Sequence, residues 1–185
     1  MKFEILKPQD YKKTHWSGGT TTELYIYPKS SNLQNLDFQF RISTATVETE
    51  SSTFTIFPGV SRIILPLLGE MTLIHDNENP VYLKSFAQDS FSGSSITKCF
   101  GKVTDFNLMT RGNAKGTIKM IELQPGEHHT VRTKNTVIYC FSGEIKIENQ
   151  YLNTHETLVL NSVIEQPYDL EAISKSILIQ VELNF

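Results

Sequence analysis

The chain has 185 residues, of which 39% are hydrophobic, so it can bury one substantial core or two small fused ones, and intrinsic disorder is excluded as its main state. Its 17 basic and 20 acidic residues give a net charge of -3 without any basic run. This charge pattern argues against nucleic acid and anionic membrane surfaces as partners.

The amino-terminal residues 1–7 contain neither a sustained apolar region nor a small-residue cleavage site. No stretch of the sequence approaches the roughly 18 apolar residues of a membrane-spanning helix. We therefore expect a soluble, cytoplasmic protein that does not associate with membranes.

A loop rich in glycine and threonine precedes the strand predicted at residues 24–27. Glycine allows close approach of the backbone, so this loop can place N–H and hydroxyl groups around a polar ligand. A tight loop in which the tryptophan plugs the core explains the same residues, and both interpretations stay open. The candidate ligand residues here are Trp16, Gly18, Gly19, Thr20 and Glu23.

Two candidate residues, Arg41 and Ser43, alternate with the apolar residues of the strand predicted around 38–43. Arg41 is then either a solvated outer residue or a bidentate anchor for a carboxylate. In the first case the apolar face fills the space between the sheets, and in the second Arg41 and Ser43 face the lumen of the first barrel. A buried arginine would require a bound carboxylate or an internal partner such as Glu23.

Two further segments carry the remaining candidates for a small-anion site. Arg62 follows the Pro58-Gly59 turn, which predicts a place near a barrel rim. In the strand predicted at residues 105–111, alternation puts the polar side chains on one face and Phe106 and Leu108 on the other. The candidates on the polar face are Asp105, Asn107 and Arg111.

Short alternating runs and frequent turns predict an all-β chain without a helix longer than two turns. The segment 65–74 resembles the segment 137–147, because Gly69-Glu70 and Gly143-Glu144 each separate two strands and each copy is followed by Tyr-Leu. This repeat predicts two fused cupin-like (jelly-roll) β-barrels, a bicupin. We expect the barrels to span residues 1–112 and 113–185 and to pack as one unit.

The histidines and cysteines do not form a metal-binding pattern. The region 57–69 contains no histidine, and the adjacent His128 and His129 point to opposite faces of a strand. Cys99 and Cys140 lie in apolar runs without a ligand spacing, as expected for buried thiols. We predict no metal and no cofactor.

Four motifs in the same order resemble the HutD/Ves family, and the similarity extends over nearly the whole chain. The resemblance implies a two-barrel cupin-like fold in a bacterial cytoplasmic protein, with one branch associated with histidine utilisation and another with stress or cold response. The second half matches only in its general spacing, so it implies no functional residues there. The motifs are residues 16–23, 41–47, 57–62 and 105–111.

Three functions fit the sequence. The first, which we favour, is a non-catalytic protein that binds a small anionic metabolite and regulates a degradation pathway or stress response. The second is a metal-independent cupin-type isomerase or lyase that uses Glu23 or Asp105 as general base. The third is an interaction protein, with exposed strand edges that pair two copies into a homodimer.

Overall fold

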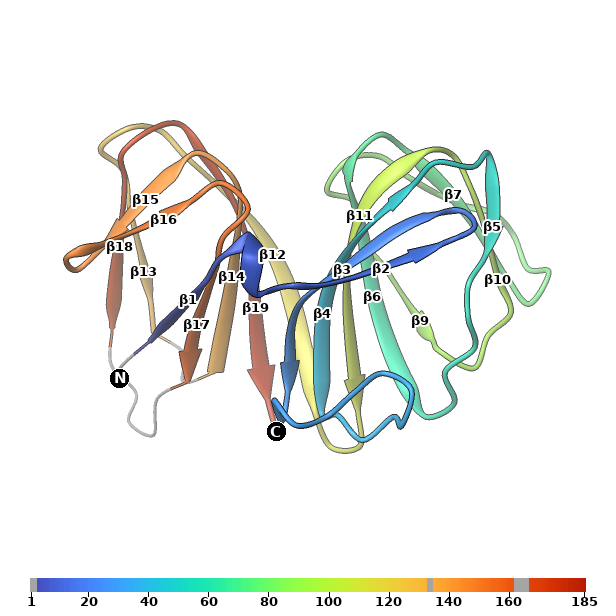
Figure 1. Ribbon diagram of the computed structural model, residues 1–185. Helices are drawn as coiled ribbons and strands as arrows, with labels where there is room; N and C mark the ends of the chain where they lie inside the picture. Colours follow the sequence, from blue (N-terminus) through green and yellow to red (C-terminus); the bar gives the residue numbers. More distant parts are fainter. Residues whose placement is uncertain (1–2, 133–134, 162–166) are drawn as a thin grey trace. The chain divides into compact units, whose positions relative to one another are not determined.

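The computed structural model describes residues 3–132, 135–161 and 167–185. Within these residues the only helical element is the 3₁₀ turn η1 (Pro8–Asp10), and no helix is long and apolar enough to cross a membrane. Strands make up the rest of the regular structure, as predicted (Figure 1).

The strands follow one another in chain order. They are β1 (Glu4–Leu6), β2 (Lys12–Trp16), β3 (Gly19–Tyr27), β4 (Phe40–Val47), β5 (Ser51–Thr53), β6 (Val60–Leu68), β7 (Met71–His75), β8 (Val81–Leu83), β9 (Asp89–Ser92), β10 (Thr97–Phe100), β11 (Val103–Arg111), β12 (Lys115–Leu123), β13 (His128–Val131), β14 (Asn135–Ser142), β15 (Glu144–Ile147), β16 (Gln150–Asn153), β17 (Thr157–Asn161), β18 (Tyr168–Ala172) and β19 (Ser176–Asn184). Most connections between successive strands are short, whereas the one between β3 and β4 spans residues 28–39.

The chain divides into two compact units, which we call the first unit (residues 11–115, with Phe185) and the second unit (residues 1–10 and 116–184). The first unit consists of a six-stranded sheet, β2-β3-β4-β11-β6-β9, and a four-stranded sheet, β5-β10-β7-β8. The second unit consists of the sheets β1-β17-β14-β19-β12 and β13-β18-β15-β16. Each unit is thus a jelly roll of two sheets, and the fold is bicupin-like without closed barrels.

The internal repeat has a direct structural counterpart. Gly69 lies between β6 and β7, and Gly143 lies between β14 and β15, both with positive φ. A Cβ atom at Gly69 would lie 2.8 Å from the carbonyl oxygen of Lys102, and one at Gly143 would lie 2.6 Å from that of Lys175. Each unit therefore turns at a glycine because the neighbouring chain passes too close for a side chain.

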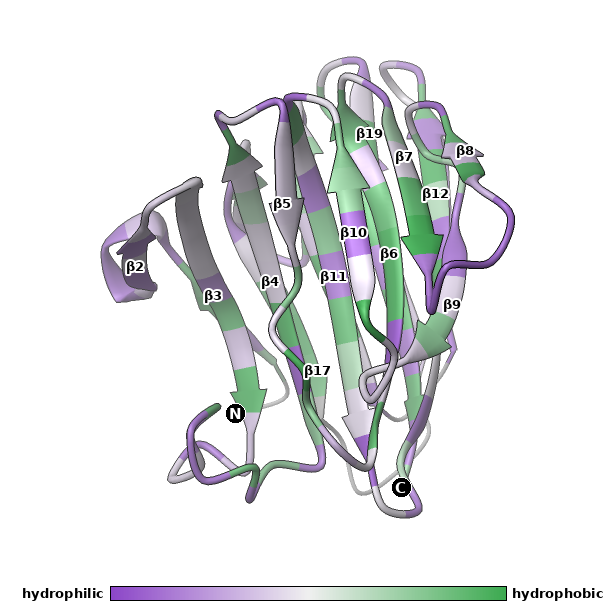
Figure 2. Cartoon of the chain, turned by 90° about the vertical axis from the view of Figure 1, so that its right-hand side faces the viewer, coloured by the Kyte–Doolittle hydropathy of each residue, from purple (hydrophilic) through white to green (hydrophobic). Residues whose placement is uncertain are grey.

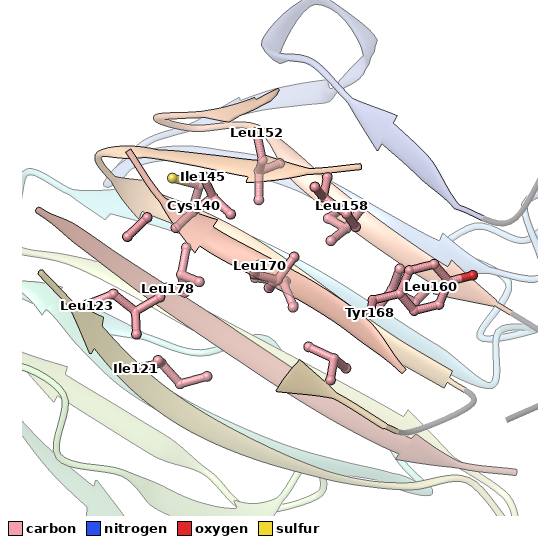
Figure 3. Close-up of a cluster of buried hydrophobic side chains, with 14 of the residues drawn as sticks. Ile121, Leu123, Cys140, Ile145, Leu152, Leu158, Leu160, Tyr168, Leu170 and Leu178 are labelled. Carbon is pink, nitrogen blue, oxygen red and sulfur yellow. The ribbon is translucent and has the colours of Figure 1, made fainter. Parts of the chain in front are cut away.

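Alternation along the strands separates the core from polar faces, as the bands along β10 and β11 show (Figure 2). In the first unit Val47, Ile64, Met71 and Leu73 belong to one buried cluster with Cys99. In the second unit a larger cluster fills the space between the sheets (Figure 3) and includes Cys140. Burial raises the pKa of each cysteine thiol to about 12, so both are neutral at physiological pH.

The amino-terminal strand belongs to the second unit, and not to the first as the predicted span of residues 1–112 implies. β1 pairs antiparallel with β17, with Glu4 opposite Val159 and Leu6 opposite Thr157. The Phe3 ring meets the Tyr168 ring edge-on, with centroids 6.0 Å apart. Local periodicity does not reveal this pairing because it joins segments about 150 residues apart.

We expect residues 113–185, expressed alone, to aggregate. That fragment lacks β1, which leaves the edge of β17 unpaired, and it lacks Phe3, whose burial contributes about 2 kcal/mol. Size-exclusion chromatography and a thermal melt followed by circular dichroism would test this, with the full chain as control. A monomeric fragment that unfolds cooperatively would contradict the expectation.

Candidate functional site

The floor of the candidate site is formed by three neighbouring strands of the six-stranded sheet. In the register of β4, β11 and β6, Arg41 is opposite Met109, which is opposite Arg62. One step along the sheet, Ser43 is opposite Asn107, and the next step on this face brings Asp105 opposite Ala45. Two arginines, an amide and a carboxylate therefore occupy successive rows on one face of the sheet.

The opposite face of the same strands is apolar. Ile42, Phe106 and Leu108 are almost completely buried there. This confirms the alternation expected for β11, and it fixes Arg41 and Ser43 on the face that carries Asp105 and Asn107.

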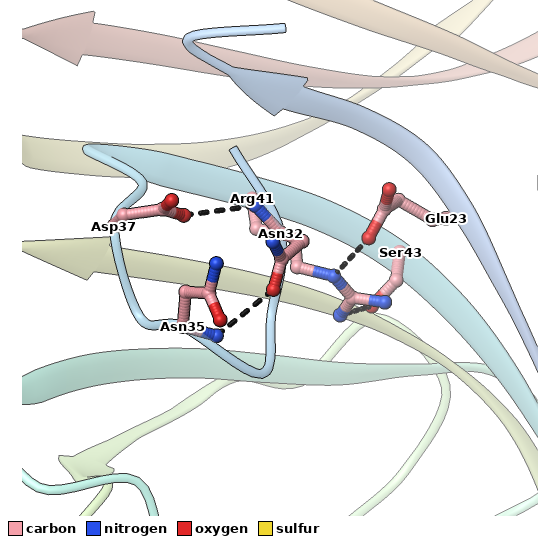
Figure 4. Close-up of polar contacts among 6 residues, drawn as sticks. All are labelled: Glu23, Asn32, Asn35, Asp37, Arg41 and Ser43. Atoms are coloured by element: carbon pink, nitrogen blue, oxygen red, sulfur yellow. Dashed lines mark hydrogen bonds and ion pairs between the residues drawn. The ribbon is translucent and has the colours of Figure 1, made fainter. Parts of the chain in front are cut away.

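A cavity of about 310 Å³ lies over this polar face, entirely within the first unit. Side chains from β2 and β5, together with the segments around Leu33 and Phe57, form its remaining walls. Hydrogen bonds within the loop after β3 hold Leu33 in place, because the backbone N–H of Asn32 donates to Asp37 Oδ1 and the backbone N–H of Asn35 donates to Asn32 Oδ1, each at 2.9 Å (Figure 4). The cavity thus combines charged and hydroxyl groups on its floor with aromatic and aliphatic walls.

Arg41 has an internal partner. Its Nε donates to Glu23 Oε2 at 2.6 Å, and its Nη1 donates to Ser43 Oγ at 3.0 Å (Figure 4). A β-bulge between Glu23 and Tyr25 shifts the register of β3 and leaves Glu23 opposite Ser43. Arg41 therefore faces the cavity with its charge largely compensated by Glu23.

Arg62 lies between two aromatic rings. Its guanidinium carbon is 4.8 Å from the ring centroid of Phe54 and 5.1 Å from that of Phe91, which is the cross-strand neighbour of Arg62 on β9. Its Nε is buried and has no hydrogen-bond partner among the described residues. Burial lowers the pKa of Arg62 to about 10, against the opposing attraction of Asp105, so it remains a cation at neutral pH.

Asp105 is a buried carboxyl group on the cavity floor, with 4% of its surface exposed. Burial raises its pKa to about 7, and the positive charge of Arg62 only partly opposes this shift. On the same strand, Asn107 Oδ1 is buried and has no hydrogen-bond partner within the described part of the chain. Asn107 Oδ1 and Arg62 Nε are thus two buried polar atoms near each other in the sheet that have no hydrogen-bond partner in the described chain, which is unusual in a folded protein.

The glycine-rich loop has a structural role in the turn between β2 and β3. Trp16 contributes to the cavity wall, whereas Gly18, Gly19 and Thr20 do not. The Trp16 ring covers Gly18, where a Cβ atom would come within 2.0 Å of it. The Thr20 hydroxyl is hydrogen-bonded to His15 Nδ1 at 3.0 Å on the exposed side. The glycines are therefore needed for close packing rather than for placing N–H groups around a ligand.

We expect Gly19→Ala to destabilise the first unit by about 2–4 kcal/mol. Gly19 has a φ of 155°, and a Cβ atom there would lie 1.9 Å from the carbonyl oxygen of Thr46. Urea denaturation would measure the loss. Gly112→Ala is the matched control, since Gly112 also has a positive φ but no atom within 4 Å of an added Cβ. Equal losses in the two variants would contradict the steric explanation.

Arg111 lies outside the cavity. It is the exposed last residue of β11, opposite Val60. Alternation places Arg111 on the same face of β11 as Asp105 and Asn107, but the cavity does not extend that far along the sheet. The sequence pattern could not show where along the strand the site ends.

The sequence did not predict the two aromatic residues that lie beside Arg62. Phe54 and Phe91 hold Arg62, yet neither stands next to it in the sequence. Their only signal was an aromatic side chain in a short strand-like run, which is equally typical of core positions. The pairing of β9 with β6 is what brings Phe91 to Arg62.

The histidines are held by separate partners. His128 Nδ1 lies 2.7 Å from Asp169 Oδ2, and His129 Nε2 lies 2.8 Å from Gln180 Oε1. His75 is hydrogen-bonded to both Asp89 and Thr97. Within the ranges that the structure describes, no three histidine, cysteine or acidic residues are grouped as metal ligands.

Two jelly-roll units, one of them with a cavity over a floor of buried charged and polar side chains, define a cupin-like protein of the bicupin type. The fold is similar to that of the bacterial pirin YhhW from Escherichia coli, with a TM-score of 0.73 and 10% identity over 97% of each chain.

The chain belongs to the HutD family, whose model matches residues 8–178. Protein Ves from Citrobacter koseri is 27% identical over 144 residues, which cover 75% of this chain and 71% of that protein. HutD from Pseudomonas fluorescens SBW25 has a TM-score of 0.76 at 21% identity, covering 99% of this chain and 100% of that one. The conserved protein PA5104 from Pseudomonas aeruginosa PAO1 has a TM-score of 0.84 at 24% identity, covering both chains completely. These matches confirm the family expected from the motifs.

Proposed function

We propose that this protein binds a small metabolite bearing a carboxylate in the cavity of the first unit. The observation that carries the proposal is Arg62, a buried cation whose Nε has no hydrogen-bond partner in the described chain. A buried donor without a partner is costly, and a ligand carboxylate satisfies it with a charge-assisted hydrogen bond. The apolar walls provided by Phe54, Phe57 and Leu33 suit a ligand with an apolar body.

In this proposal the protein acts by binding in the cytoplasm, without turnover. Its membership of the HutD family supports a regulatory role in histidine utilisation or in a stress response. The ligand is therefore sought among small carboxylates, including imidazole carboxylates and acyl-glutamates.

Isothermal titration calorimetry with formate, acetate, benzoate, imidazole-4-carboxylate and N-acetylglutamate tests the proposal. We expect saturable binding with one site per chain for at least one of them. Benzamide, the neutral counterpart of benzoate, should bind at least tenfold more weakly than benzoate. The absence of binding by every carboxylate at millimolar concentration would overturn the proposal.

The second candidate function is a metal-independent isomerase or lyase, and the observation that supports it is the state of Asp105. A buried carboxyl group with a pKa raised to about 7 is suited to exchange a proton with a bound substrate at neutral pH. Glu23 is less suited to this role because it is paired with Arg41. Deuterium incorporation into N-acetylglutamate in D₂O, catalysed by the native protein and lost in Asp105→Asn, would support this candidate. No incorporation would favour binding alone.

A further inference from the structure

The charges of the protein's own side chains around the cavity sum to zero when Asp105 is ionised. Arg41 and Arg62 line the cavity from β4 and β6, and Asp105 lines it from β11. Glu23, on β3, does not line the cavity but is hydrogen-bonded to Arg41. Cys99, on β10, also interacts electrostatically with Asp105, and burial keeps its thiol neutral by raising its pKa to about 12. The site therefore has two positive and two negative groups when Asp105 is ionised.

The four charges do not form two equivalent pairs. Glu23 and Arg41 are joined by a hydrogen bond of 2.6 Å, so they compensate each other directly. Arg62 and Asp105 attract each other through space, but Arg62 Nε still lacks a hydrogen-bond partner in the described residues. Arg62 is consequently the cation available to an incoming carboxylate.

A ligand carboxylate at Arg62 would bring a second negative charge to a buried site that already contains Asp105. Two carboxylates that share one site cannot both stay ionised at little cost, and one of them takes up a proton. Asp105 is 4% exposed and lies on the strand next to that of Arg62, so water cannot readily screen the repulsion.

We propose that a carboxylate binds in this cavity together with one proton, which is shared between the ligand and Asp105. The inference rests on the proposed function and makes Asp105 a ligand-binding residue. Once protonated, Asp105 can donate an O–H hydrogen bond to the ligand carboxylate, while Arg62 supplies the charge. Charge balance around the cavity is then restored.

The protonation of Asp105 is already close to balance at neutral pH, since burial raises its pKa to about 7 despite the nearby Arg62. A ligand carboxylate adds negative charge and competes for Arg62, and both effects raise that pKa further. Binding should therefore weaken as the pH rises above 7, because the ligand binds together with a proton and the concentration of free protons falls.

Benzoate is a suitable probe because a simple carboxylic acid, with a pKa of about 4, does not itself titrate between pH 6 and 9. We expect its Kd in Tris buffer to rise about tenfold per pH unit between pH 7.5 and 9. Phenol red in weakly buffered solution should report the uptake of about one proton per bound benzoate at pH 8.

Asp105→Asn should bind benzoate with a Kd independent of pH and without proton uptake, because the amide is neutral at every pH tested. Glu78→Gln, a matched change at an exposed position of the first unit, should behave as the native protein. Thermal melts of both variants would establish that they are folded. The proton measurement on the native protein does not depend on either variant.

The outcomes separate this inference from the proposed function. Benzoate binding with a constant Kd and no proton uptake would overturn the shared proton and leave the carboxylate site intact. Proton uptake that persists in folded Asp105→Asn would overturn the assignment to Asp105. No benzoate binding at any pH would overturn the inference, and the other carboxylates would then decide the proposed function.

Discussion

Replacing Arg62 by methionine should weaken carboxylate binding at least 100-fold while leaving the Tm unchanged or higher. The change removes the one cavity cation with a buried Nε that lacks a partner in the described chain. Loss of a charge-assisted, bidentate contact accounts for about 3 kcal/mol, or two orders of magnitude in Kd. Stability should not fall, because methionine keeps an apolar side chain between Phe54 and Phe91 and removes a poorly solvated charge.

Arg41→Met is the matched control, because Arg41 lies in the same row of the sheet as Arg62 and is also replaced by methionine. It leaves Glu23, with 16% of its side chain exposed, without its ion-pair partner. We expect a loss of about 3 kcal/mol and a clearly lower Tm. Differential scanning fluorimetry and calorimetry with benzoate would measure both variants. Equal losses of Tm in the two, or retained binding in Arg62→Met, would contradict the division of roles between the arginines.

Asp105→Asn should remove a dependence of stability on pH between about 4 and 7. The pKa of Asp105 is raised from 3.8 to about 7 in the folded protein, so in this range the folded state holds a proton that the unfolded state has released. Its contribution is therefore fully present below pH 4 and is lost as the pH rises through 7. At about 1.4 kcal/mol per pKa unit, the loss reaches up to about 4 kcal/mol.

Urea denaturation at several pH values from 4 to 8.5 would measure this effect as the difference in unfolding free energy between the native protein and Asp105→Asn. The unfolding free energy of Asp105→Asn should increase relative to that of the native protein as the pH rises, and this difference should level off above pH 7.5. For Glu78→Gln the difference should stay nearly constant. A constant difference for Asp105→Asn as well would show that the carboxyl group titrates alike in both states.

Much of the fold was predictable from local patterns. The alternation in residues 103–111 identified a strand and put Asp105 and Asn107 on one face, because side chains in a strand point to opposite sides in turn. The repeated Gly-Glu turn identified two similar units, because a strand crossing that leaves no space for a Cβ atom requires glycine in both.

Which face of a strand lines a cavity was decided only by long-range pairing. For Arg41 the sequence allowed an outer or an inner position, and the pairing of β4 with β11 and of β11 with β6 placed it in the row with Arg62. The bulge in β3 then brought Glu23 opposite Ser43, where it reaches Arg41. A one-residue difference in register would reverse these faces, and local sequence does not determine register.

The sequence by itself determined the strands, the two-unit plan, the family and most of the polar residues on the cavity floor. The tertiary structure alone distributed their roles: Arg41 compensated by Glu23, Arg62 held between two phenyl rings, Gly18 and Gly19 confined to a turn, and Arg111 outside the cavity. The physical reason is that residue type and alternation act within a single strand. Charge compensation and burial, in contrast, depend on strands such as β6 and β9 that meet only after folding.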